Sequence, residues 1–149
     1  GEANMEFEAI TCLALNIYFE ARNQPTKGQI AVSQVVMNRV ESPDYPDDVC
    51  EVVYQGPSRP SWKGTGEMIP VRHKCQFSWY CDGKSDNPKD LEAYEKARML
   101  SWGVYSGTMD DLVDGALWYH ADYVTPGWAQ SKRPTASYGN HIFYTWMME

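Results

Sequence analysis

Apolar residues recur at helical spacing in the amino-terminal part of the chain. Between Met5 and Arg22 they form one stripe, made of Ile10, Leu13, Ala14, Ile17 and Ala21. This period predicts an amphipathic helix over residues 5–22. The sequence Asn23-Gln24-Pro25 predicts the end of that helix, because a residue before proline avoids helical geometry.

A second helix is predicted to begin at Thr26 and to end before Ser42-Pro43-Asp44. Its apolar face consists of Val32, Val35, Val36 and Val40. Thr26 and Gln29 have the spacing of a capping box, in which two side chains satisfy the first free N–H groups of a helix.

Two further helices are predicted downstream. A short one covers residues 47–54 and ends at Gly56. A longer one has Pro88 as its first residue, a position that proline favours, and Gly107 as its stop. The residues expected along one side of this longer helix are Leu91, Tyr94, Arg98, Trp102 and Tyr105.

The other segments are predicted to be loops and short strands. Residues 56–90 are rich in Gly, Pro, Ser and Asp, which is typical of long irregular structure that carries function. Residues 116–121 and 141–146 are short and aromatic, as strands are, and residues 125–139 between them are rich in turn formers. The pattern indicates a mainly helical α+β fold, with a small β-element and long cleft loops, in a single domain over residues 1–149.

The charge of the chain narrows the range of partners. Thirteen Lys and Arg stand against 20 Asp and Glu, so the formal net charge is -7. Nucleic acid is not an expected partner, because phosphate contacts need a basic patch. Membrane insertion is not expected either, because no apolar stretch approaches the roughly 20 residues that span a bilayer.

Four cysteines allow two disulfides in three possible connectivities. Cys75 and Cys81 are close enough in sequence to close one loop, which would leave Cys12 to pair with Cys50. Reduced cysteines in the core are the alternative. The sequence leaves both possibilities open.

Glu20 lies at the border of the apolar stripe of the first predicted helix. At about 100° per residue it falls close to Leu13 on the helical wheel, and it sits in the last turn, beside the negative end of the helix dipole. Both placements disfavour the charged carboxylate and raise its pKa, as a general acid near neutral pH requires. The alternative is that Glu20 and Arg22 are ordinary solvated charges at a helix end.

Five short blocks carry more specific combinations of residues. They are Ala14–Arg22, Gly28–Val32, Val36–Val40, Cys75–Trp79, and Gly115–Leu117 taken with Gly139–Tyr144. In this order they resemble the spore-cortex-lytic (SleB-type) cell-wall hydrolases, whose first helix ends in a Tyr-x-Glu-Ala-Arg pattern. The loop Trp79–Lys84 resembles the versions carried by phages and Gram-negative bacteria.

The resemblance implies a lysozyme-like fold and cleavage of peptidoglycan glycan strands between N-acetylmuramic acid and N-acetylglucosamine. It implies that Glu20 is the catalytic glutamate and that the block Gln76-Phe77-Ser78 forms part of the cleft wall. No cofactor is expected, and the protein is expected to act on the cell wall, in the periplasm or outside the cell, as a monomer. An acidic chain is an awkward match for the anionic parts of that wall.

The route to the wall is a separate expectation. No signal peptide is recognised at the start of the sequence. An export signal would therefore have been removed, or the protein would reach the wall by another route, such as phage-mediated lysis.

Glycoside hydrolysis commonly uses two carboxyl groups, and a second one is hard to identify here. Asp82, Asp86 and Asp122 are the candidates, but no spacing places any of them near Glu20, and loop aspartates commonly form turns. A lytic transglycosylase needs only Glu20, which protonates the leaving oxygen and then accepts the proton of the muramoyl 6-hydroxyl as that group attacks internally. We favour this route, with a hydrolytic muramidase as the alternative.

A sugar polymer needs hydrogen bonds to its acetamido groups and aromatic faces for its rings. The candidates for hydrogen bonding are Gln76, Ser78, Tyr119, His120, Asn140 and His141. The candidates for ring contacts are Trp79, Trp128 and Tyr144. Packing in the core or within loops is the alternative for each, and it is the preferred interpretation for Phe77.

Three other classes of site compete with this interpretation. His73, Cys75 and Cys81, with His120 or His141, could bind zinc, but no Cys-x-x-Cys or His-Glu-x-x-His motif supports a metal, and none is expected. A cysteine nucleophile with a histidine partner rests only on the presence of both residue types. A non-catalytic wall-binding module suits the aromatic content, but it has no use for a carboxyl group at an apolar border.

Overall fold

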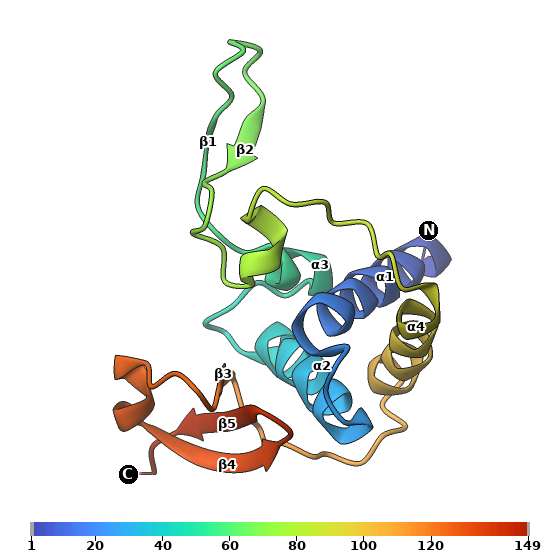
Figure 1. Ribbon diagram of the computed structural model, residues 1–149, viewed down its shortest axis with the longest axis vertical. Helices are drawn as coiled ribbons and strands as arrows, with labels where there is room; N and C mark the ends of the chain where they lie inside the picture. The colour runs from blue at the N-terminus through green and yellow to red at the C-terminus, as the bar shows by residue number, and fades with distance from the viewer. Residues whose placement is uncertain (1, 149) are drawn as a thin grey trace.

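The computed structural model describes residues 2–148 and has the α+β architecture expected from the sequence (Figure 1). The helices are α1 (Glu2–Ala21), α2 (Thr26–Glu41), α3 (Val49–Val53) and α4 (Leu91–Tyr105). The strands are β1 (Ser58–Pro60), β2 (Met68–Pro70), β3 (Trp118–Ala121), β4 (Lys132–Tyr138) and β5 (His141–Trp146). Two 3-10 turns complete the fold, η1 (Ser78–Cys81) and η2 (Gly127–Ser131). The helices lie together on one side, with β3, β4 and β5 on the other.

Helix α1 is the centre of the helical part and packs against α2, α3 and α4. Its predicted apolar stripe is buried throughout, from Ile10 to Ala21. Leu13 packs with residues of α2 and α3, while Ala14 and Ile17 pack with Ala97 of α4. Burial on three sides explains why α1 carries so few polar residues along this stripe.

Helix α4 differs from its prediction in its start and in its buried face. The cap is Asp90, whose side chain accepts a hydrogen bond from the Ala93 N–H, so Pro88 lies outside the helix. The buried residues are the small Ala97 and Ser101 together with Val104. Leu91 and Trp102, expected on one side with Tyr94, Arg98 and Tyr105, are 73% and 51% exposed. Small side chains let α4 approach α1 closely, which the apolar pattern alone did not indicate.

The predicted capping box of α2 is absent. The residue before the helix is Pro25, and no side chain caps it. The Gln29 side-chain amide donates instead to the backbone carbonyl of Gln24, and the Thr26 hydroxyl accepts from Lys96 of α4. Both side chains form these other contacts and do not cap the helix. The capping box predicted from their spacing was therefore wrong.

Strands β3, β5 and β4 form an antiparallel sheet in that order. The prediction of a turn-rich stretch over 125–139 is wrong for β4, which pairs with β5 through an irregularity between Pro134 and Ala136. The sheet packs one face, with Phe143 at its centre, on α2. Pairing with β5 and this burial override the weak strand propensity of the β4 sequence.

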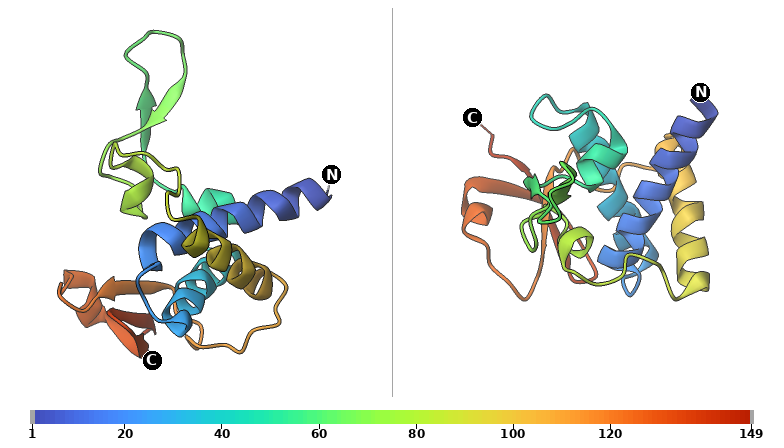
Figure 2. Two further views of the ribbon diagram at one scale, coloured as in Figure 1. Left: turned by 45° about the vertical axis from the view of Figure 1, so that its right-hand side comes forward. Right: turned by 90° about the horizontal axis from the view of Figure 1, so that it is seen from above.

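Residues 56–90 are less irregular than predicted, because they contain the antiparallel β1–β2 hairpin and η1. The hairpin stands clear of the helices and of the larger sheet, as Figures 1 and 2 show. We call this projecting segment, Pro57–Lys74, the arm. Most of its residues are exposed, including Trp62 near its tip.

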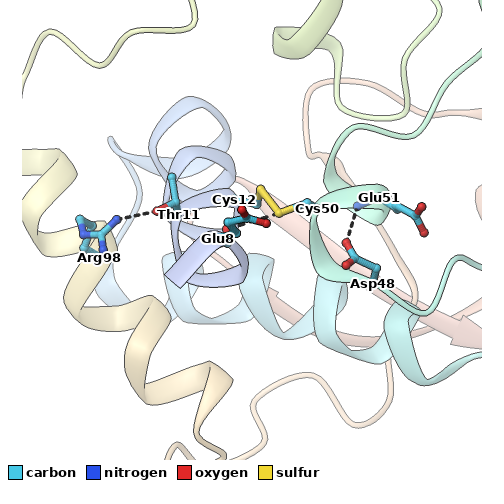
Figure 3. Close-up of a disulfide and its surroundings, with 7 residues drawn as sticks. All are labelled: Glu8, Thr11, Cys12, Asp48, Cys50, Glu51 and Arg98. Atoms are coloured by element: carbon cyan, nitrogen blue, oxygen red, sulfur yellow. Dashed lines mark hydrogen bonds between the residues drawn. A yellow bond between two sulfur atoms is a disulfide. The ribbon is translucent and has the colours of Figure 1, made fainter. Parts of the chain in front are cut away.

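The cysteines form two disulfides, Cys12–Cys50 and Cys75–Cys81. The first joins α1 to α3, close to a hydrogen bond from Arg98 of α4 to the Thr11 hydroxyl (Figure 3). The second closes a short loop that directly follows the arm. With both pairs bonded, the alternative of reduced core thiols does not apply to the described structure.

None of the described helices is long and apolar enough to cross a bilayer.

Candidate active site

Glu20 stands in the last turn of α1 and faces a pocket of about 170 Å³ between the helices and the sheet. The residues that line it are Glu20, Arg39, Gln76, Phe77, Trp118, Tyr119 and Trp128. They come from α1, α2, the segment before η1, β3 and η2. The pocket therefore exists only when helices and sheet have come together.

Tyr119 fixes the Glu20 carboxyl group. Its hydroxyl donates a hydrogen bond of 2.6 Å to Oε1 of Glu20. His141 and Phe143 of β5 pack against the Tyr119 ring, with centroid distances of 5.1 and 5.4 Å. Because Oε1 is occupied as an acceptor, Oε2 is the oxygen left to carry a proton toward a bound substrate.

Arg39 places a buried positive charge in the wall of the pocket. Its Nε donates to the carbonyl oxygen of Leu117, and its guanidinium lies over the rings of Tyr45 and Phe77 at 4.9 and 5.3 Å. Its Nη1 has no hydrogen-bond partner among the described residues. Such an arginine can act on Glu20 through its charge without contacting it directly.

Burial raises the pKa of Glu20 above its ordinary value of 4.5. The Tyr119 hydrogen bond and the Arg39 charge oppose this shift in the pKa without cancelling it. Burial, and then the neighbouring Glu20 carboxylate, raise the pKa of Tyr119 well above its usual value, so Tyr119 stays a neutral donor. The arrangement suits a carboxyl group that both gives and takes a proton.

Glu20 is the one carboxyl group among the described residues that line the pocket. The other candidates, Asp82, Asp86 and Asp122, lie outside this lining. Asp82 accepts a hydrogen bond from the backbone N–H of Lys84, which is the turn-forming role expected of a loop aspartate.

A family model described as Cell Wall Hydrolase matches residues 23–144. The chain belongs to the cell wall hydrolase family. The matched region begins just after Glu20, so the role of that residue rests on the pocket and not on this match.

Sequence relatives point the same way. The chain is 31% identical over 135 residues to a spore cortex-lytic enzyme of Halalkalibacterium halodurans, covering 90% of this chain and 34% of the relative. It is 39% identical to a spore cortex-lytic enzyme of Bacillus cereus, covering 90% of this chain and 43% of the relative. The chain thus spans well under half the length of these curated relatives.

Solved structures share the fold. The catalytic domain of the Bacillus cereus SleB protein superposes with a TM-score of 0.64 at 24% identity, covering 92% of this chain and 89% of that one. The catalytic domain of the germination-specific lytic transglycosylase SleB of Bacillus anthracis gives 0.62 at 23% identity, covering 92% and 93%. The α+β fold of this cell wall hydrolase is therefore that of SleB catalytic domains.

The structure brings some of the predicted binding residues of this cell wall hydrolase to the pocket and leaves others outside. Gln76, Tyr119 and Trp128 line it together with Glu20. Ser78, Trp79, His120, Asn140, His141 and Tyr144 do not.

Two of the residues outside the pocket support a residue that lines it. His120 stacks on Tyr144, with 5.2 Å between ring centroids, and its Nε2 lies 2.8 Å from the Tyr144 hydroxyl. Trp128 packs edge-on against both rings. His120 and Tyr144 therefore hold the Trp128 indole in place from behind the pocket.

His141 has a similar position behind Tyr119. Its side chain is buried, and its Nδ1 has no hydrogen-bond partner among the described residues. Burial, and then the charge of His120, lower the pKa of His141 against an opposing effect of Asp122, which favours a neutral ring. His141 contacts the Tyr119 ring and not the pocket.

Trp79 was predicted to offer a ring face to a sugar, and this prediction is wrong because Trp79 is buried. It is only 6% exposed, stacks on Phe19 and donates through Nε1 to Asn16 of α1. Asn140 lies at the turn between β4 and β5, where its N–H donates to Gln24, and Ser78 is exposed at the start of η1. The sequence of these segments did not show which of their side chains the rest of the fold would bury.

Two lining residues, Arg39 and Trp118, were missed by sequence reasoning. Arg39 follows Val32 by seven positions and Val35 by four, so a charged residue on the buried stripe of α2 was the available signal. Trp118 precedes Tyr119 on β3, and Lys132 lies over its ring at 4.6 Å. Nothing in the sequence pattern separates Trp118 from the other aromatic residues of its strand.

Among the described residues no three His, Cys, Asp or Glu side chains gather as a metal site. Cys75 and Cys81 are bonded to each other and cannot act as thiolate ligands or as nucleophiles.

Proposed function

We propose that this chain cleaves peptidoglycan glycan strands between N-acetylmuramic acid and N-acetylglucosamine, as a lytic transglycosylase in which Glu20 is both acid and base. The observation that carries the proposal is a single carboxyl group, with a raised pKa, in a pocket that connects helices and sheet. A hydrolytic route would call for a second carboxyl group to activate water or to form a covalent intermediate. The described lining offers none.

The reaction begins with Glu20 protonated. Its Oε2 gives the proton to the glycosidic oxygen as the bond to the muramoyl C1 breaks, while the Tyr119 hydroxyl holds Oε1. The carboxylate formed in this step is stabilised by that hydrogen bond and by the Arg39 charge. The muramoyl 6-hydroxyl then attacks C1 of the same sugar and returns its proton to Glu20, which yields a 1,6-anhydro product and restores the acid.

The remaining lining residues have roles in binding. The indoles of Trp118 and Trp128 offer aromatic surface to sugar rings, and the exposed Gln76 amide can donate to and accept from an acetamido group. The polar lining and the lack of a basic group other than Arg39 suit a neutral sugar in the pocket itself.

The comparisons support the proposal without extending to the substrate of this chain. The curated relatives are spore cortex-lytic enzymes, and the solved Bacillus anthracis domain is a lytic transglycosylase. We propose that residues 1–149 act as a single catalytic domain on the cell wall, outside the cytoplasm and without a partner subunit. Delivery of the protein to the wall during phage-mediated lysis would fit the resemblance of the Trp79–Lys84 loop to the versions carried by phages.

The products of purified cell walls test the proposal. Mass spectrometry of released muropeptides should show products one water lighter than those of a muramidase. Glu20→Gln should release none, while Glu6→Gln, which removes an exposed carboxyl group from the same helix, should behave like the wild type. Reducing ends throughout the wild-type products would establish a muramidase instead.

A further inference from the structure

A second hollow, of about 380 Å³, lies at the base of the arm. Its lining residues are Arg59, Ile69, Pro70, Arg72, Tyr80, Cys81, Gly83 and Lys84. Three of them are cations, and no carboxylate is among them. Ile69, Pro70 and Tyr80 add apolar surface beside the charges. The sugar chemistry at Glu20 uses none of these residues.

The position of Arg72 is set by contact with backbone. A Cβ atom on Gly83 would lie 2.7 Å from Nη2 and 2.8 Å from Cζ of Arg72, so the guanidinium occupies the space a side chain would take. Gly83 also has a φ of +82°, which side-chain-bearing residues rarely adopt. The loop thus holds the guanidinium in the hollow without an acidic partner in the lining.

Two acidic residues, Asp82 and Asp86, lie within two positions of Lys84, and neither of them lines the hollow. Asp82 accepts a hydrogen bond from the backbone N–H of Lys84, which ties it to the turn. The ammonium group of Lys84 and the guanidinium of Arg72 are on exposed residues, accessible to a ligand.

The charge of this segment is opposite to that of the rest of the chain. Residues 57–84 contain five Lys and Arg against two acidic residues, a net charge of +3. The remaining residues contain eight Lys and Arg against 18 Asp and Glu. Positive charge is therefore concentrated on the part that projects from an otherwise acidic protein, where it can meet an anionic ligand with least repulsion.

The linings of the hollow and of the Glu20 pocket come within a few residues of each other along the chain, at η1. Phe77, directly before η1, lines the Glu20 pocket, while Tyr80 and Cys81 within η1 line the hollow. One turn of 3-10 helix thus separates the lining residues of the two sites. A ligand long enough to pass η1 could reach both.

We propose that this hollow binds free carboxylates of the stem peptides of the glycan strand whose sugars occupy the Glu20 pocket. The proposal rests on the proposed function, because it takes peptidoglycan as the substrate. Arginine and lysine match carboxylates in charge and in hydrogen bonding, and the apolar wall suits the peptide beside them. The site also explains how an acidic protein engages an anionic wall.

The test measures binding of intact sacculi, freed of wall polymers, and of glycan strands from which an amidase has removed the stem peptides. In a Glu20→Gln background, Arg72→Gln/Lys84→Gln should weaken binding to intact sacculi about tenfold, the loss expected for charged hydrogen bonds. Binding to stripped strands should stay unchanged. A charge-matched control, Lys27→Gln/Lys96→Gln, should not move either value.

Folding and catalysis are checked separately from binding. With Glu20 restored, Arg72→Gln/Lys84→Gln should still cleave stripped strands at the wild-type rate, which a misfolded protein could not do. Arg72→Lys/Lys84→Arg should keep most of the binding to intact sacculi. If the wild type does not cleave even intact sacculi, the proposed function fails, whereas a loss of binding confined to intact sacculi tests the hollow separately.

Three outcomes would overturn the proposal. One is an equal loss of binding on intact and stripped material. Another is a loss no greater than that of the Lys27 and Lys96 control. The third is binding that depends on these residues only when phosphate-bearing wall polymers are left in place, since the ligand would then be a phosphate and not a stem-peptide carboxylate.

Discussion

The Glu20 pocket and the hollow at the base of the arm are built in opposite ways. The Glu20 pocket draws its residues from α1, α2, the segment before η1, β3 and η2, and Tyr119 lies 99 residues from the glutamate it holds. The hollow at the base of the arm takes every lining residue from positions 59–84, and Cys75–Cys81 closes one short loop within that segment.

The chemistry that each site needs explains this difference. A carboxyl group with a raised pKa requires burial, and burial requires several elements to close around it. Capture of an anion requires only cations with ordinary ionisation, which a short local segment can present to solvent. The proton transfer that we propose is therefore placed in the core of this fold, and the proposed charge recognition on a projection from it.

The largest effect should come from the residue at the centre of the pocket. Glu20→Gln should lower the rate of wall cleavage about a thousandfold or more, because it removes the one carboxyl group among the described residues that line the pocket. Turbidity loss of purified walls measures the rate, and sacculus pull-down measures binding, which should be retained. Substantial residual cleavage would show that another residue is the acid.

Removing each of the two disulfides should lower the free energy of unfolding by a different amount. Removing Cys12–Cys50, whose cysteines are 38 residues apart, should lower the free energy of unfolding by about 4 kcal/mol, against about 2 kcal/mol for Cys75–Cys81, which are 6 apart. Loop-closure entropy grows with the length of the closed loop. Denaturant unfolding of the double alanine variants measures both.

Loss of the Cys75–Cys81 disulfide should also affect sacculus binding and strand cleavage to different extents. Cys75→Ala/Cys81→Ala should weaken binding to intact sacculi more than it lowers cleavage of stripped strands, although the opened loop also carries Gln76 and Phe77 of the Glu20 pocket. The contrast breaks if its loss on stripped strands matches its loss on intact sacculi.

Tyr119→Phe should change the pH dependence of the reaction. The hydrogen bond from Tyr119 lowers the pKa of Glu20, so its loss raises that pKa further. The acid then stays protonated to higher pH, and the basic limb of the rate profile should move upward, with a rate lower by about tenfold. Arg72→Gln should leave the profile in place, since that residue lies in the other hollow.

The smallest effect concerns the cost of burying Glu20. Its folded pKa is above its ordinary value of 4.5, so the folded state holds the proton to higher pH than the unfolded chain. Wild-type stability should therefore fall as pH rises from the unfolded pKa through the folded one. Glu20→Gln should be the more stable protein above this window, and the advantage should vanish below it. Urea unfolding across this pH range measures it, and a constant difference would contradict burial of the group.

The sequence by itself determined the helices with the strongest periodicity and the place of Glu20 on one of them. The stripe from Ile10 to Ala21 could be buried on one side only, and this puts Glu20 at its border. Cys75 and Cys81 were close enough to close one loop, although the sequence left open whether they were bonded. In each case the information is local, because it depends on residues within a few turns or one loop of each other.

Only the tertiary structure decided which side chains meet. Tyr119 and Arg39 reach Glu20 through packing of β3 and α2, and β4 is a strand because β5 pairs with it. Trp79 lies in the core and Trp128 in the pocket, although both are loop tryptophans in sequence. Burial is a property of the assembled fold, so it selects among equivalent residues in a way that no local pattern records.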